Sequence, residues 1–337
     1  MLILVDAMGG DNAPEEIVKG CIDAINESEG YDIVLIGDVD RINNILKGKK
    51  FDARRLQLHH TTEVITNDDY PTKAIKEKKD SSMVVGLKLL KEKFGDVFLS
   101  AGNSGALLAG TLLTLGRIKG VHRPALAPVI PTKSGGTMLI DAGLNTSCRP
   151  ENLQQFGIIG SIYMKEIFGI QNPRVGLINV GSENRKGSEV LKQAYEKLSI
   201  SNINFVGNVE GRELPEGAVD VAVCDGFVGN VLLKFLEGVG SYIFSGLKNL
   251  FSANLVSKLS SFLVRKELRN FSKGMDYEEY GGTPILGVNG VVFKCHGSSS
   301  SKAIKNTITR ACSFVRSTVL EQIRTQINSM EGDNIEA

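Results

Sequence analysis

Short hydrophobic runs alternate along this chain with longer stretches whose hydrophobic positions recur at helical spacing. The runs are rich in valine, isoleucine and leucine and predict strands: LILVDA, DIVLIGD, LQLHH, DVFLSA, ALAPVIP, TMLIDAG, RVGLINVG, INFVGN and VDVAVCDG. Helical patterns occupy residues 14–26, 81–93, 103–116, 152–168 and 188–198. This succession indicates an α/β layered fold with a largely parallel sheet. Ligands of such folds bind beyond the carboxyl ends of the strands.

The stretch from residue 246 to residue 273 departs from this alternation. Its hydrophobic residues recur at helical spacing without an adjoining strand: Leu247, Phe251, Leu255, Leu259 and Phe262. Basic residues accompany them, among them Lys258 and Arg265. A pair of amphipathic basic helices can pack against a second subunit or lie on an anionic membrane surface. The residues alone leave both possibilities open.

No low-complexity linker divides the chain into independent domains. We expect one domain over residues 1–330, with a helical excursion at about residues 241–275, followed by a disordered tail over residues 331–337. The chain contains one short internal sequence similarity, because LVDAMGG at Leu4 and LIDAGLN at Leu139 both end a strand with Asp-Ala and small residues. A duplicated lobe would explain this similarity, and so would a coincidence between the sequences at two strand ends.

Composition and charge narrow the class of protein. With 337 residues, of which 42% are hydrophobic and 23% charged, the chain can bury a substantial globular core. The formal net charge of +1 gives no long-range attraction for nucleic acid. Residues 1–6 contain no basic segment, so no secretory signal is expected. No hydrophobic run approaches the roughly 18 to 20 residues that span a bilayer, so we expect a cytoplasmic protein whose membrane contact is peripheral.

The cysteines are scattered along the chain and are odd in number: Cys21, Cys148, Cys224, Cys295 and Cys312. They form no C-x-x-C motif and show no cysteine and histidine spacing typical of a metal site. We therefore expect buried reduced thiols and no bound metal.

Glycine- and serine-rich loops follow several predicted strands and precede helices. They supply the candidate phosphate-binding residues Asp6, Gly9, Gly10, Asp11, Asn103, Ser104, Gly297, Ser298 and Ser299. Glycines let the backbone approach a ligand closely, and the N-terminus of a helix favours an anion. Each loop alone is equally well explained as a tight structural turn. Together they predict a site for a small phosphate or for the head of an acyl phosphate.

The loop from residue 179 to residue 187 adds a cation to this set. Asn179, Glu183 and Lys186 are spaced so that one cleft can receive an ammonium group and hydrogen-bonding groups. Arg123, in the sequence HRPALA, is a second candidate cation. Alternatively, Lys186 is an exposed loop residue without a functional role, and Arg123 forms a structural ion pair.

Other catalytic classes fit the sequence less well. The dinucleotide motif G-x-G-x-x-G follows no predicted strand, and GSENRKGS reverses the G-K-[ST] ending of a P-loop. No Ser-His-Asp arrangement is evident, since only His296 lies in a glycine- and serine-rich loop. Phosphorolysis of a thioester needs no covalent nucleophile, because phosphate is the nucleophile and the protein holds it and stabilises the oxyanion.

Several colinear motifs resemble the PlsX family of bacterial phosphate acyltransferases. They are DAMGGD, PTKAIKEKKDSSM, SAGNSGA, RPALA, DAGLNTSCRPENLQQF, NVGSENRKGSE, CDGFVGNVLLKFLEG and GGTPILGVNGVVFKCHGSSS. They run from residue 6 to about residue 300. Two of these motifs add Asn145 and Asn230 to the candidate binding residues. Lys186 matches the lysine of the family's K-G motif and is our first choice for a catalytic cation.

The resemblance implies a fold, an activity and partners. The implied fold is a three-layer α/β/α arrangement like that of isopropylmalate dehydrogenase and phosphotransacetylase, with two intertwined lobes around one mixed, largely parallel sheet. The implied reaction converts long-chain acyl carrier protein and inorganic phosphate to acyl phosphate and free carrier protein, without nucleotide or metal cofactor. The product serves a membrane glycerol-phosphate acyltransferase in phospholipid biosynthesis. Homodimers and peripheral membrane attachment through the basic helices are also implied.

Three alternatives stay open at the level of sequence. A phosphotransacetylase that uses acyl-coenzyme A and a decarboxylating dehydrogenase share the expected architecture. A noncatalytic membrane scaffold is a rival from another class. Within the favoured interpretation, Lys186 offsets negative charge during attack on the thioester, and His296 can protonate the departing thiolate.

Overall fold

The computed structural model describes residues 1–254, 256–257, 260, 264, 266 and 277–333, and the chain divides into two compact units. Unit 1 comprises Met1–Pro128, Ile162–Gln171 and Glu278–Ala337. Unit 2 comprises Val129–Ser161 and Asn172–Tyr277. Each unit therefore takes its residues from separate stretches of the chain. The expectation of a single domain over residues 1–330 stays a prediction.

The described strands of unit 1 form a seven-stranded sheet in the order β3-β2-β1-β4-β12-β11-β5. Their bounds are β1 (Leu2–Asp6), β2 (Asp32–Gly37), β3 (Leu56–His60), β4 (Val97–Ser100), β5 (Ala125–Leu126), β11 (Thr283–Leu286) and β12 (Val291–Lys294). From β3 to β12 neighbouring strands are parallel, whereas β11 is antiparallel to both of its neighbours. Ile3, Leu4 and Ile33 are completely buried, as expected for parallel strands with both faces covered.

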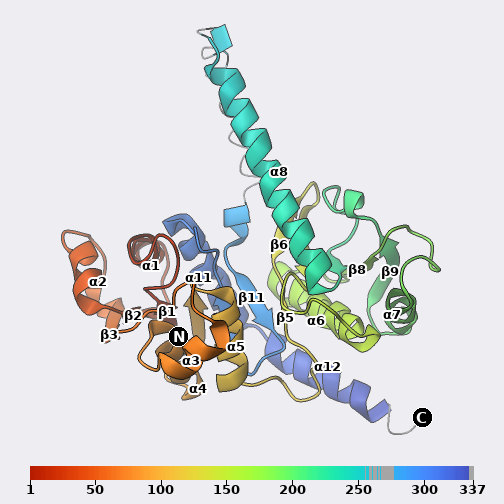
Figure 1. Ribbon diagram of the computed structural model, residues 1–337, viewed down its shortest axis with the longest axis horizontal. Helices are drawn as coiled ribbons and strands as arrows, with labels where there is room; N and C mark the ends of the chain where they lie inside the picture. Colours follow the sequence, from red (N-terminus) through yellow and green to blue (C-terminus); the bar gives the residue numbers. More distant parts are fainter. Residues whose placement is uncertain (255, 258–259, 261–263, 265, 267–276, 334–337) are drawn as a thin grey trace. The chain divides into compact units, whose positions relative to one another are not determined.

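Helices cover both faces of this sheet (Figure 1). They are α1 (Glu15–Glu27), α2 (Val39–Leu46), α3 (Pro71–Glu77), α4 (Ser82–Lys91), α5 (Ser104–Thr114), α11 (Ser301–Arg316) and α12 (Val319–Asp333). Helices α1 and α11 lie on one side of the strands, with α3, α4 and α5 on the other. A Cβ on Gly20 would lie 2.6 Å from Ile304, so this glycine permits the close packing of α1 on α11.

The described strands of unit 2 form a five-stranded sheet in the order β6-β7-β10-β8-β9. Their bounds are β6 (Val129–Thr132), β7 (Gly135–Ile140), β8 (Arg174–Ile178), β9 (Asn204–Val209) and β10 (Val221–Val223). All neighbours are parallel except β6 and β7. The helices of this part of the chain are α6 (Pro150–Phe168), which ends in unit 1, α7 (Glu189–Ser199) and α8 (Gly226–Ser252). Two sheets thus replace the single sheet that the resemblance implied. Pro128, which lies between β5 and β6, has no amide proton with which to continue a ladder.

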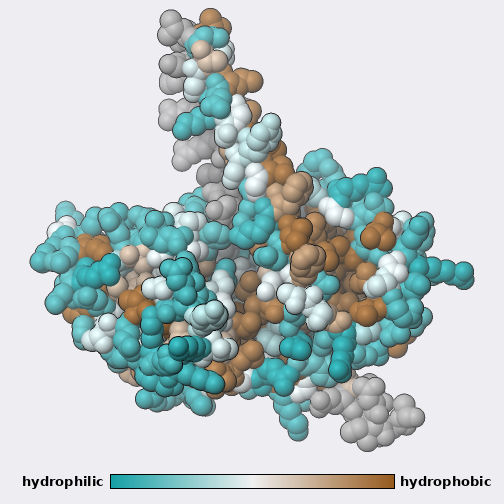
Figure 2. Space-filling view, viewed as in Figure 1, coloured by the Kyte–Doolittle hydropathy of each residue, from teal (hydrophilic) through white to brown (hydrophobic). Residues whose placement is uncertain are grey.

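Helix α8 is the largest departure from the sequence-based expectation. It begins at Gly226, well before the predicted excursion, and Asp225 caps it by accepting the N–H of Val228. Its first turns pack Val228, Leu232 and Leu236 against the core of unit 2. Farther along, hydrophobic side chains lie on the surface, as Figure 2 shows.

Helix α8 also corrects the expectation that no stretch approaches a membrane span. With 27 residues it is long and apolar enough to cross a bilayer by length and composition alone, and only 6% of its most apolar window is buried. The sequence run is broken by polar residues such as Asn230 and Lys234, which hid it from a search for uninterrupted hydrophobic residues.

The other element predictions have mixed outcomes. All the predicted strand runs contain strands, but β11 and β12 were missed because each is only four residues long and lies between closely spaced glycines. Helix α12 continues to Asp333, three residues into the predicted tail. Of the predicted excursion, Leu247 and Phe251 lie in α8 and are partly exposed. The remaining candidates lie outside the described residues: Leu255, Lys258, Leu259, Phe262 and Arg265.

Candidate functional site

Three loops of unit 1 meet at the carboxyl edge of its sheet. They follow β1, β4 and β12, which are parallel and adjacent, so the three strands end at the same edge. The N–H of Asp11 donates to the carbonyl of Gly297 at 2.7 Å. A Cβ on Gly9 would lie 2.7 Å from the amide nitrogen of Gly102, so the first two loops also touch. The structure therefore brings together the loops that carry most of the predicted phosphate-binding residues.

The loop after β4 leads into α5, and no acidic side chain lies in the first turn of this helix. Asn103 caps it by accepting the N–H of Ala106 at 3.0 Å. The Nδ2 group of Asn103 donates to the carbonyl of Thr66 at 3.1 Å, so this side chain orders the loops and does not face a ligand. Ser104 and Gly105 are exposed beyond the cap. Their position at a helix N-terminus suits an anion.

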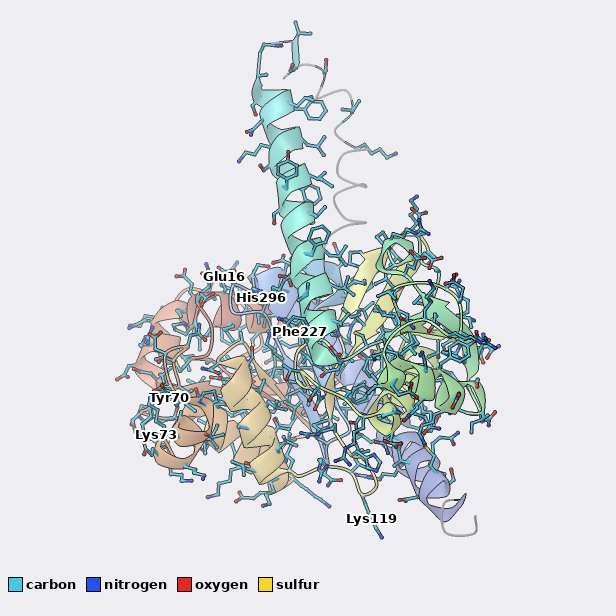
Figure 3. All side chains as sticks on the ribbon, turned by 45° about the vertical axis from the view of Figure 1, so that its right-hand side comes forward. Glu16, Tyr70, Lys73, Lys119, Phe227 and His296 are labelled. Atoms are coloured by element: carbon cyan, nitrogen blue, oxygen red, sulfur yellow. The ribbon has the colours of Figure 1, made fainter. Side chains whose placement is uncertain are left out.

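Helix α11, by contrast, already has an anion at its N-terminus. The N–H of Ser301 donates to the Glu16 carboxylate at 2.8 Å, and Glu16 lies near His296 in Figure 3. This backbone hydrogen bond, together with Lys19, lowers the pKa of Glu16. A carboxylate from α1 thus occupies the place where a phosphate was predicted.

His296 and Ser298 form a polar pair in the loop that precedes α11. The Oγ atom of Ser298 lies 2.8 Å from Nδ1 of His296, and the N–H of Ser298 donates to the same nitrogen at 3.3 Å. In the neutral ring, an accepting Nδ1 places the single proton on Nε2. Ser298 is exposed, whereas Ser299 is buried and its N–H donates to the carbonyl of His296 at 3.0 Å. Ser298 therefore suits ligand contact better than Ser299 does.

Asp6 is buried at the base of these loops. It is 1% exposed and accepts hydrogen bonds from the backbone and from two serine hydroxyls, so it does not face a ligand. Burial raises the pKa of its carboxyl group, against the opposing effect of the hydrogen bonds from Ser100 and Ser82.

A hollow of about 470 Å³ adjoins the loop after β1. Its lining includes Asp11, Asn12 and Pro14 from that loop and Arg41 from the first turn of α2. The exposed guanidinium of Arg41 adds a cation that the sequence analysis missed. Its position just after the strand β2, and hence at the same sheet edge, is the signal that could have identified it.

Arg123 does not join these loops. It precedes β5, and its carbonyl lies beside Gly287 in the turn between β11 and β12, at the amino end of β12. Lys119, which is four residues earlier, lies at the opposite end of unit 1 from His296 (Figure 3). Arg123 therefore lies away from the unit 1 loops, and its role as the second candidate cation stays a prediction. This placement arises because β5 is reached from the amino edge of the sheet, after α5 has returned the chain there.

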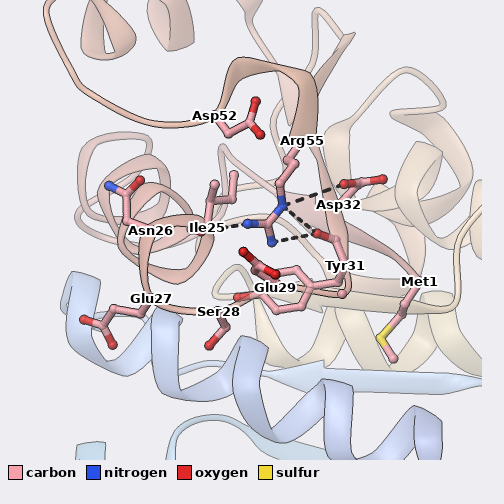
Figure 4. A pocket seen from close by; sticks show the side chains of 11 residues that line it. Met1, Ile25, Asn26, Glu27, Ser28, Glu29, Tyr31, Asp32, Asp52 and Arg55 are labelled. Atoms are coloured by element: carbon pink, nitrogen blue, oxygen red, sulfur yellow. Dashed lines mark hydrogen bonds and ion pairs between the residues drawn. The ribbon is translucent and has the colours of Figure 1, made fainter.

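Another hollow of unit 1, of about 860 Å³, also lies at the amino edge (Figure 4). Tyr31, Asp32 and Arg55 line it. The guanidinium of Arg55 donates to the carbonyls of Tyr31 and Ile25 and stacks over the Tyr31 ring at 5.3 Å. The N–H donors of Arg55 are therefore occupied by carbonyls of the protein. Because the hollow also lies at the sheet edge opposite to the glycine-rich loops, it is not a candidate phosphate site.

In unit 2, the loop that carries Lys186 follows β8. Asn179 is buried, and its Nδ2 donates to the carbonyl of Lys186 at 3.0 Å. Asn208, which the sequence analysis missed, donates to the carbonyl of Glu183 at 2.8 Å. The ammonium of Lys186 lies 3.9 Å from the Glu183 carboxylate, and its side chain is 53% exposed. Asn179 and Asn208 therefore hold the loop, and Lys186 remains accessible.

The loop after β7 lies at the same edge of the unit 2 sheet, because β7, β10 and β8 are parallel. Asn145 is buried and donates through Nδ2 to the Asp141 carboxylate at 2.8 Å. Asn230, in α8, lies against Gly143 of this loop, with Oδ1 3.5 Å from an ideal Cβ there. Asn145 thus orders its loop, whereas Asn230 is exposed.

Neither metal ligation nor thiol chemistry stands out among the described residues. No group of three histidine, cysteine or acidic side chains gathers in the described parts of the chain. All five cysteines are free, and all but the partly exposed Cys148 are buried. Burial raises the pKa of Cys295 to about 11, so this thiol stays protonated near neutral pH.

Comparisons with known proteins match the whole chain to enzymes of one kind. A family model described as fatty acid synthesis protein matches residues 1–322. The phosphate acyltransferase of Acetivibrio thermocellus is 59% identical over 336 residues, covering 100% of this chain and 99% of that protein. Those of Thermoanaerobacter pseudethanolicus and Clostridioides difficile are 51% and 46% identical, each over 99% of this chain and over 99% and 98% of their own length.

Solved structures share the fold at low sequence identity. A phosphotransacetylase from Streptococcus pyogenes has a TM-score of 0.64 at 15% identity, with 94% of each chain covered. A branched-chain phosphotransacylase from Enterococcus faecalis has a TM-score of 0.58 at 14% identity, covering 94% of this chain and 100% of that one. These likenesses confirm the predicted α/β class with largely parallel sheets.

Proposed function

Since this chain belongs to the fatty acid synthesis protein family, the PlsX family of phosphate acyltransferases, we propose that its acyl donor is a long-chain acyl carrier protein. Inorganic phosphate is the acceptor, and the products are acyl phosphate and free carrier protein. The product then serves a membrane glycerol-phosphate acyltransferase in phospholipid biosynthesis. The family membership and the phosphate acyltransferase activity are the premise, whereas donor, product fate and residue roles are the proposal.

The observation that supports phosphate binding most directly is the open N-terminus of α5. Exposed Ser104 and Gly105 begin this helix, no acidic residue follows in its first turn, and the loop of Gly9 lies against it. Backbone N–H groups at such a position bind a tetrahedral anion without a nucleotide motif. The N-termini of α1 and α11 suit phosphate less, because carboxylates occupy their first turns or approach them.

The proposed reaction is direct attack of phosphate on the thioester. A phosphate oxygen forms a bond to the acyl carbon, the carbonyl becomes an oxyanion, and the bond from carbon to sulfur then breaks to release thiolate. Lys186 offsets the negative charge that accumulates on the oxyanion. Thiolate leaves readily, because thiols have a pKa of roughly 8.5. In its imidazolium form, with protons on both ring nitrogens, His296 donates the Nε2 proton to the departing sulfur and keeps the Nδ1 proton beside the Ser298 hydroxyl.

A coenzyme A thioester is the alternative donor, because the structural neighbours include phosphotransacetylases. To decide between the two donors, the purified protein is assayed with palmitoyl acyl carrier protein and with palmitoyl-coenzyme A, each in the presence and absence of phosphate. We expect phosphate-dependent release of free carrier protein, with a kcat/KM for the carrier-protein donor at least tenfold higher. A preference for the coenzyme A thioester would overturn the proposed donor. Adding a nicotinamide cofactor in a parallel assay tests the dehydrogenase alternative.

We also propose that the chain acts as a homodimer attached peripherally to the cytoplasmic face of the membrane. The support is the exposed side of α8, where Phe227, Val231, Phe235 and Tyr242 recur at helical spacing and are all more than half exposed. Exposed hydrophobic surface of this extent is characteristic of contact with another subunit or with lipid.

A further inference from the structure

Asp6 connects two of the unit 1 loops through a single buried carboxylate. Its Oδ1 atom accepts the N–H groups of Met8 and Gly9 at 3.1 and 3.0 Å and the hydroxyl of Ser82 at 2.5 Å. Its Oδ2 atom accepts the hydroxyl of Ser100 at 2.6 Å. Both oxygens are thus occupied by donors from this chain, which excludes direct contact with a substrate.

Ser100 extends this network to the start of α5. Its Oγ atom accepts the N–H of Gly102 at 3.1 Å while its hydroxyl proton goes to Asp6. The hydrogen bonds therefore run in one direction, from the Gly102 amide through the Ser100 hydroxyl to the carboxylate. Gly102 lies two residues before Ser104, the first residue of α5.

The two loops meet directly above this carboxylate. A Cβ on Gly9 would lie 2.5 Å from Oδ2 of Asp6 and 2.7 Å from the amide nitrogen of Gly102. Only glycine allows this approach, so the two loops are in close contact here and both bond to the same carboxylate through Met8, Gly9 and Ser100. A shift of the Asp6 carboxylate therefore changes the position of both loops.

We propose that Asp6 is a positioning residue that fixes the loop after β1 and the start of α5 relative to each other and thereby sets the affinity for phosphate. The proposal rests on the proposed function, in which these loops hold phosphate. A carboxylate is required because it accepts hydrogen bonds on both oxygens. An asparagine amide would turn a donor group either towards Ser100 or towards the N–H groups of Met8 and Gly9.

A second carboxylate in unit 2 has a corresponding arrangement. Asp141 is completely buried at the end of β7 and accepts the N–H groups of Leu144 and Asn145, the latter at 2.6 Å. A Cβ on Gly226, the first residue of α8, would lie 2.7 Å from the same carboxylate. The sequence similarity between the ends of β1 and β7 therefore corresponds to a structural similarity. At each strand end a buried aspartate accepts backbone N–H groups of the following loop, beside a helix N-terminus.

The test uses Ser100→Ala, which removes one link and leaves the carboxylate and its other donors in place. We expect the KM for phosphate to rise about tenfold, the scale of one hydrogen bond to a charged group, while the KM for the acyl donor and kcat change little. Asp6→Asn should raise the phosphate KM further. Thr307→Val is the matched control. Thr307 is a buried hydroxyl that accepts the N–H of Gly282 at 2.6 Å and donates to the carbonyl of Ala303 at 2.7 Å, so its hydrogen bonds do not involve Asp6 or Ser100.

Thr307→Val should lower Tm without changing the phosphate KM. The positioning role is overturned if Ser100→Ala lowers Tm as this control does and retains the wild-type KM for phosphate. Failure of the proposed function has a different signature, because the wild-type enzyme would then release no carrier protein with phosphate. Calorimetric titration of the three variants with inorganic phosphate would still test Asp6 in that case, with weaker binding expected for Ser100→Ala and Asp6→Asn but not for Thr307→Val.

Discussion

At the scale of single residues, several polar side chains of the candidate site form hydrogen bonds to backbone groups of the protein and so are not directed at a ligand. Asn103 and Asn179 are candidate binding residues in the sequence, but the amide nitrogen of each donates to a backbone carbonyl of another loop residue. Buried amides need such partners, because an unsatisfied polar group in the interior is costly. The exposed groups beside them, Ser104 and Lys186, are therefore better placed to meet a ligand.

Replacing Lys186 with methionine should lower kcat by about a hundredfold or more, the scale seen when a charge-stabilising donor is lost. The KM values should change less, because the ammonium acts mainly on charge that develops during the reaction. Lys192→Met is the matched control, since Lys192 is similarly exposed and also lies near a glutamate. Steady-state kinetics of both variants provide the measurement. Equal kcat values in the two variants would remove Lys186 from the catalytic role.

Asp69 should make the stability of the chain depend on pH in the acid range. Its hydrogen bond with the Lys78 ammonium, at 2.5 Å, and another from the Thr66 backbone lower its pKa below 3.8. A lowered folded-state pKa contributes stability above pH 3.8, and this contribution is lost as the pH falls through the folded-state pKa. Urea unfolding of wild type and Asp69→Asn should therefore differ near neutral pH and converge in strong acid. A difference that grows on acidification would contradict this assignment.

At the scale of elements, the first turn of α8 is closely packed against the rest of unit 2, whereas there is free space around a later part of the helix. A Cβ on Gly229 would collide with the carbonyl of Asp141, whereas one on Gly240 would meet no atom within 4 Å. The two glycines therefore have opposite roles in one helix. Gly229 allows α8 to pack closely on the loop after β7, and Gly240 only lowers the helix propensity.

Gly229→Ala should destabilise the chain by about 1 to 3 kcal/mol through overpacking. Gly240→Ala should instead stabilise it by up to about 1 kcal/mol, because alanine is the better helix former. Thermal unfolding of the two variants, followed by circular dichroism, gives both values under identical conditions. Destabilisation of equal size in both would show that the outer part of α8 is as closely packed as its start.

At the scale of the whole molecule, the exposed side of α8 is the feature that a single chain leaves unexplained. A free hydrophobic surface of this length in water is unfavourable by roughly 25 cal/mol per Å² of apolar area. Association with a second copy or with lipid removes that area from water. The two outcomes are compatible, because different parts of one helix can serve each.

Phe235→Lys should weaken both self-association and membrane attachment. Phe235 is 67% exposed, so the substitution costs little in the isolated chain but places a charge in any apolar contact. Leu113→Lys is the control, because Leu113 is 60% exposed on α5. Sedimentation without lipid measures association, and flotation with anionic vesicles measures attachment. If Phe235→Lys matched wild type in both assays, α8 would form neither contact through this side chain.

The sequence by itself determined the α/β class, the glycine-rich strand exits and the family, because local hydrophobic period and short motifs depend on neighbouring residues. Tertiary structure decided which candidates meet. Strand order places Gly9 beside Gly102 and puts Arg123 at the opposite edge of the same sheet, and no local pattern encodes that order. It also decided that Asp6 and Asn103 bond inward, since their partners come from strands and loops far along the chain. Hydrogen bonding between such distant segments depends on the folded path of the chain, which the spacing of residues in one segment does not contain.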